Sequence, residues 1–344
     1  MKKRSSFIII GILLLLTGFA LYTYKYKNRN STIDGEARNF KYQDTAAITK
    51  IFIADKEGDR STLVRTKNAW VVNNKYPCRP DAILNLMEAI KHMEVKMPVS
   101  KHAKEGILKV MAATALKVEI YAGEKKVKQF YIGHETTDSE GSYALLSDPS
   151  SGENYKDPFV VFIPGFQGFL IPRFIAKEGE WRDRVVMNFT PPQMKQIKLL
   201  NNEQPDSSFT IELLSTTDFK LKDAHGKEIP FDINKMKQYL AYFQNVSYEA
   251  VFTGKAKKLE DSLAALKPFV SLSVSSNNFR TSDYKFFYKQ PTSLIPEEGV
   301  VYKHDPDRLY MRFDADKEWA LIQFYVFGKL LVNPGYFAPA SVKK

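Results

Sequence analysis

The sequence predicts an α+β protein in which an N-terminal membrane helix precedes two similar lobes, each a mostly antiparallel sheet with helices. Three observations support this fold class. An uncharged apolar run lies near the N-terminus, short segments with apolar residues at alternate positions come in groups of three, and the same order of elements occurs twice along the 344 residues. Alternation with period two is typical of strands that bury one face, and such strands followed by helices indicate an α+β architecture.

The first expected element is a membrane helix. Residues 7–22, FIIIGILLLLTGFALY, carry no charge and follow a basic tripeptide at positions 2–4. Extended to Tyr24 the run has 18 residues, about 27 Å of helix, against a bilayer core of roughly 30 Å. The anchor residues that we expect to face lipid are Phe7, Ile10, Leu14, Phe19 and Tyr22.

A cleaved signal peptide is the alternative for this segment. Gly18 and Ala20 are small residues three and one positions before a cut after Ala20. The apolar run continues past that point and ends in tyrosines, which suit a membrane interface, so we favour an uncleaved signal anchor. The short segment before the helix favours an N-in orientation. We therefore expect a single-pass protein of the bacterial inner (cytoplasmic) membrane, with its body in the periplasm and the lipid bilayer as one partner.

The positive charge of the chain is concentrated at this anchor. Of the formal net charge of +11, residues 1–30 supply six basic side chains and no acidic one, and the remaining 314 residues carry 44 basic and 39 acidic side chains. Five excess charges spread over such a body do not form a nucleic-acid-binding surface. We therefore expect no nucleic-acid partner.

The chain divides into six segments by composition and pattern. They are the membrane anchor or signal segment (1–27), a polar tether (28–45), the first α+β lobe (46–180), an inter-lobe junction (181–192), the second α+β lobe (193–333) and a C-terminal tail (334–344).

Each lobe is predicted to open with a β-meander and to continue with a helix. The alternating segments are 48–55, 61–65 and 69–72 in the first lobe, and 194–201, 208–212 and 218–221 in the second. Apolar residues then recur at helical spacing after Asp81 and after Asp232. Both aspartates are expected to cap the helix that follows, because a carboxylate can accept the unpaired N–H groups of a first turn.

The parallel between the lobes continues after these helices. Short helices rich in Lys and Ala follow, and then LKVEIYAG is answered by FVSLSVSS and YALLSDP by VVYKHDP; the ranges are 103–113 and 259–266, 116–123 and 269–276, and 143–149 and 300–306. The order and spacing of these elements, rather than sequence identity, predict an internal duplication of one unit.

No pattern of residues indicates catalysis, so we expect a protein that is not an enzyme and that uses no metal or cofactor. The five histidines lack metal-ligand spacing, and no nucleotide-binding loop or nucleophile elbow is present. The acidic residues between Asp305 and Glu318 lack the glycine and terminal glutamate of a calcium loop and are interpreted as turn carboxylates. Cys78, the single cysteine, is interpreted as a small structural residue rather than a nucleophile.

Two segments are candidate contact sites for a ligand or partner. Residues 159–174, FVVFIPGFQGFLIPRF, contain five phenylalanines; this segment is either an exposed docking loop, with Phe166 and Phe169 as contacts, or a core strand followed by a turn and a corner. Residues 181–184 combine an aromatic residue with a charge cluster, and they are either a latch between lobes or a site for an anionic ligand. The candidate residues of this second segment are Trp181, Arg182, Asp183 and Arg184.

Several of these segments together resemble the domain-of-unknown-function family 4340. The resemblance rests on the anchor, ITKIFIADK from residue 48, KVEIY at 117–121, IPGFQGFL at 163–170, WRDR at 181–184 and QFYVFGK at 323–329. It extends over residues 46 to about 330 and carries no established catalytic residues. Many relatives are encoded near ABC-2-type export systems, including those tied to gliding motility, which implies a role with an extracytoplasmic partner.

Two functions are therefore expected to compete. The first is a membrane-tethered interaction or scaffold protein of the cell envelope, an accessory of an ABC-2-type export or gliding-type complex, with a membrane or envelope protein as partner. The alternative is a module that binds an envelope glycan, peptide or lipid in a cleft between the lobes.

Overall fold

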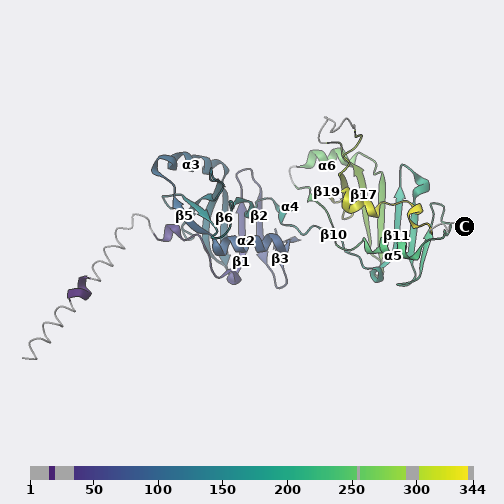
Figure 1. Cartoon of the computed structure of the whole chain (residues 1–344), viewed down its shortest axis with the longest axis horizontal. Helices are drawn as coiled ribbons and strands as arrows, with labels where there is room; N and C mark the ends of the chain where they lie inside the picture. Colours follow the sequence, from purple (N-terminus) through teal and green to yellow (C-terminus); the bar gives the residue numbers. More distant parts are fainter. Residues whose placement is uncertain (1–14, 20–34, 254–255, 292–301, 340–344) are drawn as a thin grey trace, which may run out of the picture. The chain divides into compact units, whose positions relative to one another are not determined.

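The computed structural model describes residues 15–19, 35–253, 256–291 and 302–339 (Figure 1). The chain forms two compact units, Met1–Trp181 and Arg182–Lys344, so the boundary falls at the start of the predicted junction. The α+β class and the antiparallel sheets are confirmed, since every strand pairing among the described residues is antiparallel.

The predicted membrane anchor lies almost entirely outside the described residues. This holds for Phe7, Ile10, Leu14 and Tyr22, whereas Phe19 ends a short described helical segment and is exposed. Among the described residues, none of the helices is both long and apolar enough to span a bilayer.

Unit 1 contains a nine-stranded sheet in the order β4-β3-β2-β1-β6-β7-β8-β9-β5. The predicted meander is confirmed by β1, β2 and β3, which pair in sequence. The strands are β1 (Ile48–Ala54), β2 (Arg60–Arg65), β3 (Trp70–Val72), β4 (Tyr76–Pro77), β5 (Glu94–Pro98), β6 (Leu116–Ala122), β7 (Lys125–Glu135), β8 (Ser142–Ser147) and β9 (Phe159–Phe162).

Two helices cover opposite faces of this sheet: α2 (Pro80–His92) and α3 (Lys101–Thr114) (Figure 1). Because side chains alternate along a strand, neighbouring residues of one strand belong to different cores. Phe130 of β7 packs in the main core with Leu86 of α2, whereas the adjacent Tyr131 packs with Met111 of α3. The sheet of unit 1 is thus covered on both sides.

Two expectations for unit 1 are wrong in detail. Helix α2 begins at Pro80, so Arg79 occupies the cap position and Asp81 lies in the first turn instead of capping it. Proline is favoured at the first helical position because its fixed φ is already helical. The predicted tether also ends earlier than expected, because Phe40 is buried in the main core. The short 3₁₀ helices nearby are η1 (Glu36–Arg38) and η2 (Thr45–Ala47).

Unit 2 contains an eight-stranded sheet in the order β13-β12-β11-β16-β17-β18-β19-β15 and a two-stranded sheet of β10 and β14. The second predicted meander is confirmed by β11, β12 and β13. The strands are β10 (Val185–Met187), β11 (Met194–Asn201), β12 (Phe209–Leu213), β13 (Phe219–Lys222), β14 (Val246–Ser247), β15 (Ala250–Val251), β16 (Val270–Ser276), β17 (Thr281–Tyr288), β18 (Arg308–Phe313) and β19 (Glu318–Gln323).

Helices again lie on both faces of the large sheet of unit 2. Tyr239 of α5 (Ile233–Ala241) packs in the main core with Phe286, whereas Leu263 of α6 (Lys257–Ala264) packs with the adjacent Phe287. Asp232 caps α5 as predicted, since its Oδ1 accepts the N–H groups of residues 234 and 235 at 2.7 and 3.2 Å.

The two large sheets share one strand order. In unit 1 the order β3-β2-β1-β6-β7-β8-β9-β5 corresponds strand by strand to β13-β12-β11-β16-β17-β18-β19-β15 in unit 2. Each sheet also has helices on both of its faces. One predicted correspondence is wrong, because the described residues 302–306 form a loop. The strand that occupies the position of β8 is β18, which begins just after that loop.

In each unit an aromatic segment follows the last strand of the large sheet along the chain, β9 in unit 1 and β19 in unit 2. In unit 1 this is η3 (Ile171–Arg173) with α4 (Glu178–Trp181), and in unit 2 it is α7 (Phe324–Phe327), η8 (Gly328–Leu330) and η9 (Pro334–Phe337). Phe337, expected in a C-terminal tail, is fully buried and packs edge-to-face on Phe209 and Tyr239. Phe337 therefore anchors the described part of that tail to the core. The remaining 3₁₀ helices are η4 (Pro191–Gln193) and η5 (Pro205–Ser207).

Candidate functional site

The Phe-rich segment 159–174 is partly core and partly displayed. Phe159 and Phe174 are buried in the main core of unit 1, whereas Phe166 is 39% exposed and Phe169 is half-buried. Each of the two interpretations of this segment therefore holds for different residues. The strand and the corner fix its ends, and residues 164–169 form a loop that carries two aromatic rings to the surface.

The shape of this loop depends on two glycines and one buried hydroxyl. Gly165 and Gly168 have φ angles of 79° and 129°, which residues with a Cβ adopt only at a cost. At the end of the loop, the backbone N–H of Leu170 donates to Oγ of Ser142 in β8 at 2.9 Å. The loop is thus tied to the sheet at its C-terminal end.

A pocket of about 490 Å³ lies between this loop and the first turns of α2. Its volume is in the range of small-molecule binding sites. Its lining residues are Arg79, Ala82, Asn85, Phe166, Gln167, Gly168, Phe169, Pro172, Arg173 and Ile175. Both phenylalanines predicted as contacts thus line one concave surface, together with two arginines that the sequence analysis did not select.

The two arginines are held by different contacts. The Arg173 guanidinium lies over the Phe166 ring, 4.5 Å from its centroid, and its Nη1 donates to the Asn85 carbonyl at 3.3 Å. Arg79 pairs with the exposed carboxylate of Asp81 at 3.0 Å. The lining set contains two cations and no carboxylate, so the pocket has a positive character.

Trp181 is a buried support of this pocket and not a surface contact. Its side chain is fully buried, and its Nε1–H donates to the Ile175 carbonyl at 2.8 Å. Its own carbonyl accepts the backbone N–H of Arg79 at 2.8 Å. One residue therefore joins the two chain segments that carry Ile175 and Arg79, both of which line the pocket.

The three residues after Trp181 belong to unit 2 and are not among the residues that line the Phe166 pocket. Arg182 pairs with Glu318 at 2.5 Å, and the two side chains are only 8% and 13% exposed. Asp183 is exposed, and its Oδ1 accepts the backbone N–H of Val185. The carboxylate that pairs with Arg182 thus lies in unit 2 itself, which gives this arginine a structural role there.

Tyr248 fixes the backbone that follows this ion pair. Its N–H donates to the Arg184 carbonyl at 3.0 Å, and its hydroxyl donates to the Asp183 carbonyl at 3.1 Å. Burial raises the pKa of Tyr248, so the hydroxyl stays a donor at neutral pH. Four consecutive residues predicted as one site are therefore divided between two structural roles.

A second, more polar pocket of about 420 Å³ lies in unit 2. Much of its hydrogen-bonding capacity is used internally, because Asn277 Nδ2 donates to the Pro192 carbonyl, and Asn278 Oδ1 accepts from Ser276 Oγ and from the N–H of Arg280. Its lining residues are Asn188, Phe189, Pro192, Gln193, Ser276, Asn277, Asn278, Arg280 and Ser282.

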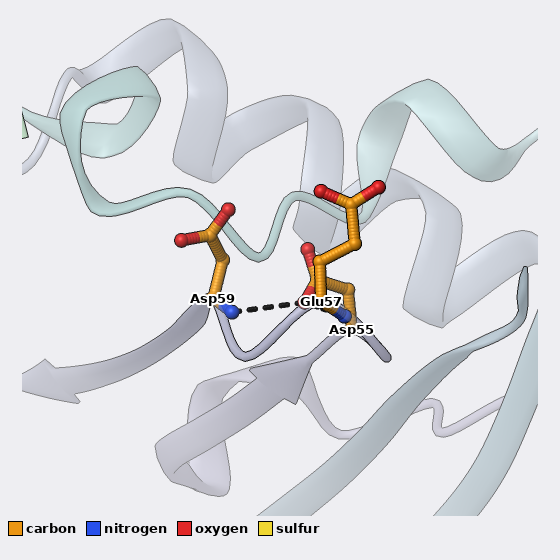
Figure 2. A group of neighbouring side chains, drawn as sticks. All are labelled: Asp55, Glu57 and Asp59. Carbon is orange, nitrogen blue, oxygen red and sulfur yellow. Dashed lines mark hydrogen bonds between the residues drawn. The ribbon is translucent and has the colours of Figure 1, made fainter. Parts of the chain in front are cut away.

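Three carboxylates, Asp55, Glu57 and Asp59, lie close together in the turn between β1 and β2 (Figure 2). Their nearest oxygen atoms lie within 4.8 Å of one another. Asp55 Oδ1 accepts the backbone N–H groups of both other residues at 2.9 Å, as an aspartate at the start of a turn does. The turn itself therefore explains the position of Asp55.

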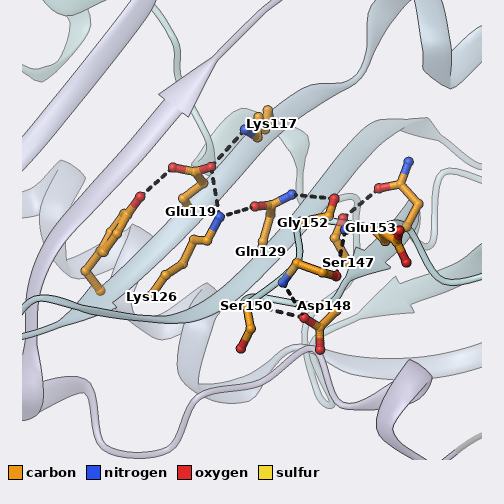
Figure 3. A network of polar contacts seen from close by, with 12 residues as sticks. Lys117, Glu119, Lys126, Gln129, Ser147, Asp148, Ser150, Gly152 and Glu153 are labelled. Carbon is orange, nitrogen blue, oxygen red and sulfur yellow. Dashed lines mark hydrogen bonds and ion pairs between the residues drawn. The ribbon is translucent and has the colours of Figure 1, made fainter.

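A polar network follows one face of β6 and β7 (Figure 3). Glu119 accepts from Lys117 at 2.8 Å and from the Tyr121 hydroxyl at 2.7 Å, and Lys126 connects it to Gln129. Burial acts to raise the pKa of Glu119, but the hydrogen bonds from Lys117 and Tyr121 and the nearby positive charges lower it overall. The carboxylate thus stays ionised and paired at neutral pH.

Cys78 is a buried thiol of the main core, as the sequence analysis expected. Burial raises its pKa to about 12, so almost no reactive thiolate forms at neutral pH. We expect the native chain to react with iodoacetamide at pH 7.5 far more slowly than the chain unfolded in urea, measured by mass spectrometry. Equal rates in both states would contradict this assignment.

The pocket arginines were missed because the contacts that bring them together span distant parts of the sequence. Arg79 precedes α2, whereas Phe166 follows β9. One local signal was available for Arg173, since it is the only charged residue within 159–174. A single charge in an aromatic segment that is otherwise apolar indicates a position at the protein surface.

Comparison with known proteins identifies a family. A family model described as "Domain of unknown function (DUF4340)" matches residues 70–265, more than half of the chain. The matched region includes the Phe166 loop and residues 181–184, and it extends into both units. No curated protein and no solved structure matches the chain.

Proposed function

The chain belongs to the DUF4340 family, which is defined by a domain of unknown function, and from this membership we propose a membrane-tethered, non-enzymatic interaction protein of the cell envelope. In this proposal residues 1–27 hold the chain in the bacterial inner membrane, and both units face the periplasm. The apolar, uncharged run at 7–22 supports this membrane anchor.

The observation that carries the proposed interaction is the pocket beside the Phe166 loop. A loop that two glycines shape and that Ser142 ties to β8 holds Phe166 and Phe169 at a concave surface with two arginines. Aromatic residues and arginine are the residue types that contribute most to binding at protein interfaces. Both phenylalanines that the sequence analysis predicted as contacts line this pocket.

The proposed partner is a membrane or envelope protein, such as a component of an ABC-2-type export or gliding-type complex. The family resemblance described in the sequence analysis implies such a partner. The alternative function is a module that binds an envelope ligand, and the same pocket supports it because a volume of about 490 Å³ suits a small molecule.

We also infer that the two units arose by duplication of one α+β unit. The common strand order, together with a helix group on each face of both sheets, supports this inference. The units differ in the aromatic segment that follows β9 in unit 1 and β19 in unit 2. This segment forms the Phe166 loop in unit 1 and α7 in unit 2. A binding role confined to one unit is consistent with that difference.

The membrane anchor is tested by placing charge in the apolar run of the full chain. An arginine near the centre of a membrane helix costs about 2.5–3.5 kcal/mol, so the double variant Ile10→Arg, Leu14→Arg should move from the membrane pellet to the supernatant after alkaline carbonate extraction. The matched control is Ile10→Val, Leu14→Ile, which should stay in the pellet. The same distribution between pellet and supernatant for all three chains would contradict the membrane anchor.

The partner is tested by affinity purification of the full chain from mild detergent, with mass spectrometry of the proteins that it retains. We expect a defined protein to be retained by the wild type and lost from Phe166→Ala, Phe169→Ala. The control is Phe279→Ala, which removes an 87% exposed phenylalanine of unit 2. The same retained set for all three chains, or an isolated chain in several detergents, would contradict the proposal.

A further inference from the structure

We propose that the Phe166 pocket of unit 1 binds an amphipathic organic anion, in which a carboxylate or a similar acidic group is attached to an aromatic or aliphatic body. This inference rests on the proposed function, because it names the chemistry that the same pocket recognises. Three features of the pocket favour negative charge, and a fourth favours the apolar body.

The first feature is the pair of guanidinium groups. Arg79 and Arg173 both line the pocket, and no aspartate or glutamate does. A guanidinium presents a planar fork of N–H donors that matches a carboxylate, and its charge persists at every physiological pH. Arg173 is held by the Phe166 ring and by the Asn85 carbonyl, so its position is defined before a ligand arrives.

The second feature is a donor on Arg79 that the described residues leave unused. The Nε of Arg79 is buried and has no hydrogen-bond partner among those residues, although the Nη2 of the same side chain pairs with Asp81. A buried donor without an acceptor costs free energy. A small shift of the Arg79 side chain toward an acidic ligand group would give this N–H an acceptor and remove that cost.

The third feature is the N-terminal end of α2. The helix begins at Pro80 with no side-chain cap, and Ala82 and Asn85, from its first two turns, line the pocket. Backbone N–H groups at a helix start are unpaired, and the helix dipole places partial positive charge there. Ala82 and Asn85 thus bring the start of α2 to the wall of the pocket, beside the two arginines.

The fourth feature is the apolar remainder of the lining. Phe166, Phe169, Pro172 and Ile175 contribute rings and aliphatic surface on the loop side. A simple inorganic anion would leave this surface without a contact. An anion with an attached ring or short chain would cover it, and burial of apolar surface adds affinity roughly in proportion to the area buried.

The test uses two probes of the same size that differ in charge, 4-(trifluoromethyl)benzoate and 4-(trifluoromethyl)benzamide. Fluorine NMR titration of the full chain in detergent, with protein-free micelles as the blank, gives the affinity for each probe. We expect the wild type to bind the benzoate at least about tenfold more tightly than the benzamide, since a charge-assisted hydrogen bond is worth about that ratio or more.

Variants assign that preference to the pocket. Arg79→Gln, Arg173→Gln should lower benzoate affinity about tenfold or more and leave benzamide affinity almost unchanged, whereas Arg60→Gln, which removes an exposed arginine of β2, should change neither. Arg173→Lys keeps the charge and should retain part of the preference if Gln variants fold poorly; thermal unfolding of each variant checks this.

Two results would overturn the inference: equal wild-type affinity for both probes, including no binding of either, or a benzoate preference that persists in the double Gln variant. Neither result bears on the retention of a partner protein that depends on Phe166 and Phe169. If the benzoate preference is absent and a partner is retained, the inference fails and the proposed function stands. If the benzoate preference is present and no partner is retained, the partner is removed and the anion site stays.

Discussion

Replacement of Trp181 by alanine is expected to destabilise unit 1 by about 3–5 kcal/mol, the range measured when a buried tryptophan is truncated to alanine. The side chain is fully buried in the main core, and its Nε1–H satisfies the Ile175 carbonyl at 2.8 Å. Truncation removes this packing, leaves a cavity and leaves that carbonyl without its donor. Hydrogen exchange with mass spectrometry is the measurement, because peptides from α2 report on unit 1 alone.

A conservative variant separates the two contributions of Trp181. Trp181→Phe keeps most of the buried apolar surface and loses the indole N–H, so a cost of about 1 kcal/mol is expected for the hydrogen bond, in addition to a smaller packing term. Protection of unit 2 peptides, such as those from α5, should stay unchanged in both variants. Wild-type protection of α2 in Trp181→Ala would refute the role of this residue as the support of the pocket.

Replacement of Arg182 by methionine is expected to destabilise unit 2 by about 3–5 kcal/mol, as happens when one partner of a buried ion pair is removed. Arg182 and Glu318 are 8% and 13% exposed and lie 2.5 Å apart. The variant leaves the Glu318 carboxylate in a poorly solvated position without this cation. Hydrogen exchange with mass spectrometry of peptides from α5, which belong to unit 2, follows the change.

Two further chains establish that the effect of Arg182→Met comes from burial of the pair. The double variant Arg182→Met, Glu318→Leu should regain much of the lost stability, because it removes both charges from the buried position. Lys257→Met breaks the exposed pair with Asp261 and should change stability by no more than about 0.5 kcal/mol. A loss in Lys257→Met equal to that in Arg182→Met would show that burial of the pair does not matter.

Local sequence pattern predicted the strands and helices well, and it failed where a long-range contact decides the outcome. The alternation in 48–55 and 194–201 predicted β1 and β11, because half-buried strands need it. Asp232 was correctly identified as a cap, whereas Asp81 lies two positions after the actual cap residue, Arg79, because Pro80 already begins α2. A sequence pattern does not distinguish these two starts without the backbone.

The candidate site was harder to predict for the same reason. Composition indicated that 159–174 is unusual, but only the tertiary structure determines that Phe174 enters the core while Phe166 stays at the surface. Trp181 and Arg182 are neighbours in sequence, yet Trp181 packs in unit 1 and Arg182 pairs with a residue 136 positions further on. The positive character of the pocket depends on Arg79, which no local pattern connects to Phe166.

Photo-cross-linking at residue 166 in the native host tests the account most directly. A benzoylphenylalanine at that position samples the surroundings of the pocket mouth, and the same group at Phe279, an 87% exposed residue of unit 2, is the matched control. The account predicts a defined cross-linked product in the membrane fraction from position 166 and none from position 279. Identical products from both positions, or no product from position 166, would contradict it.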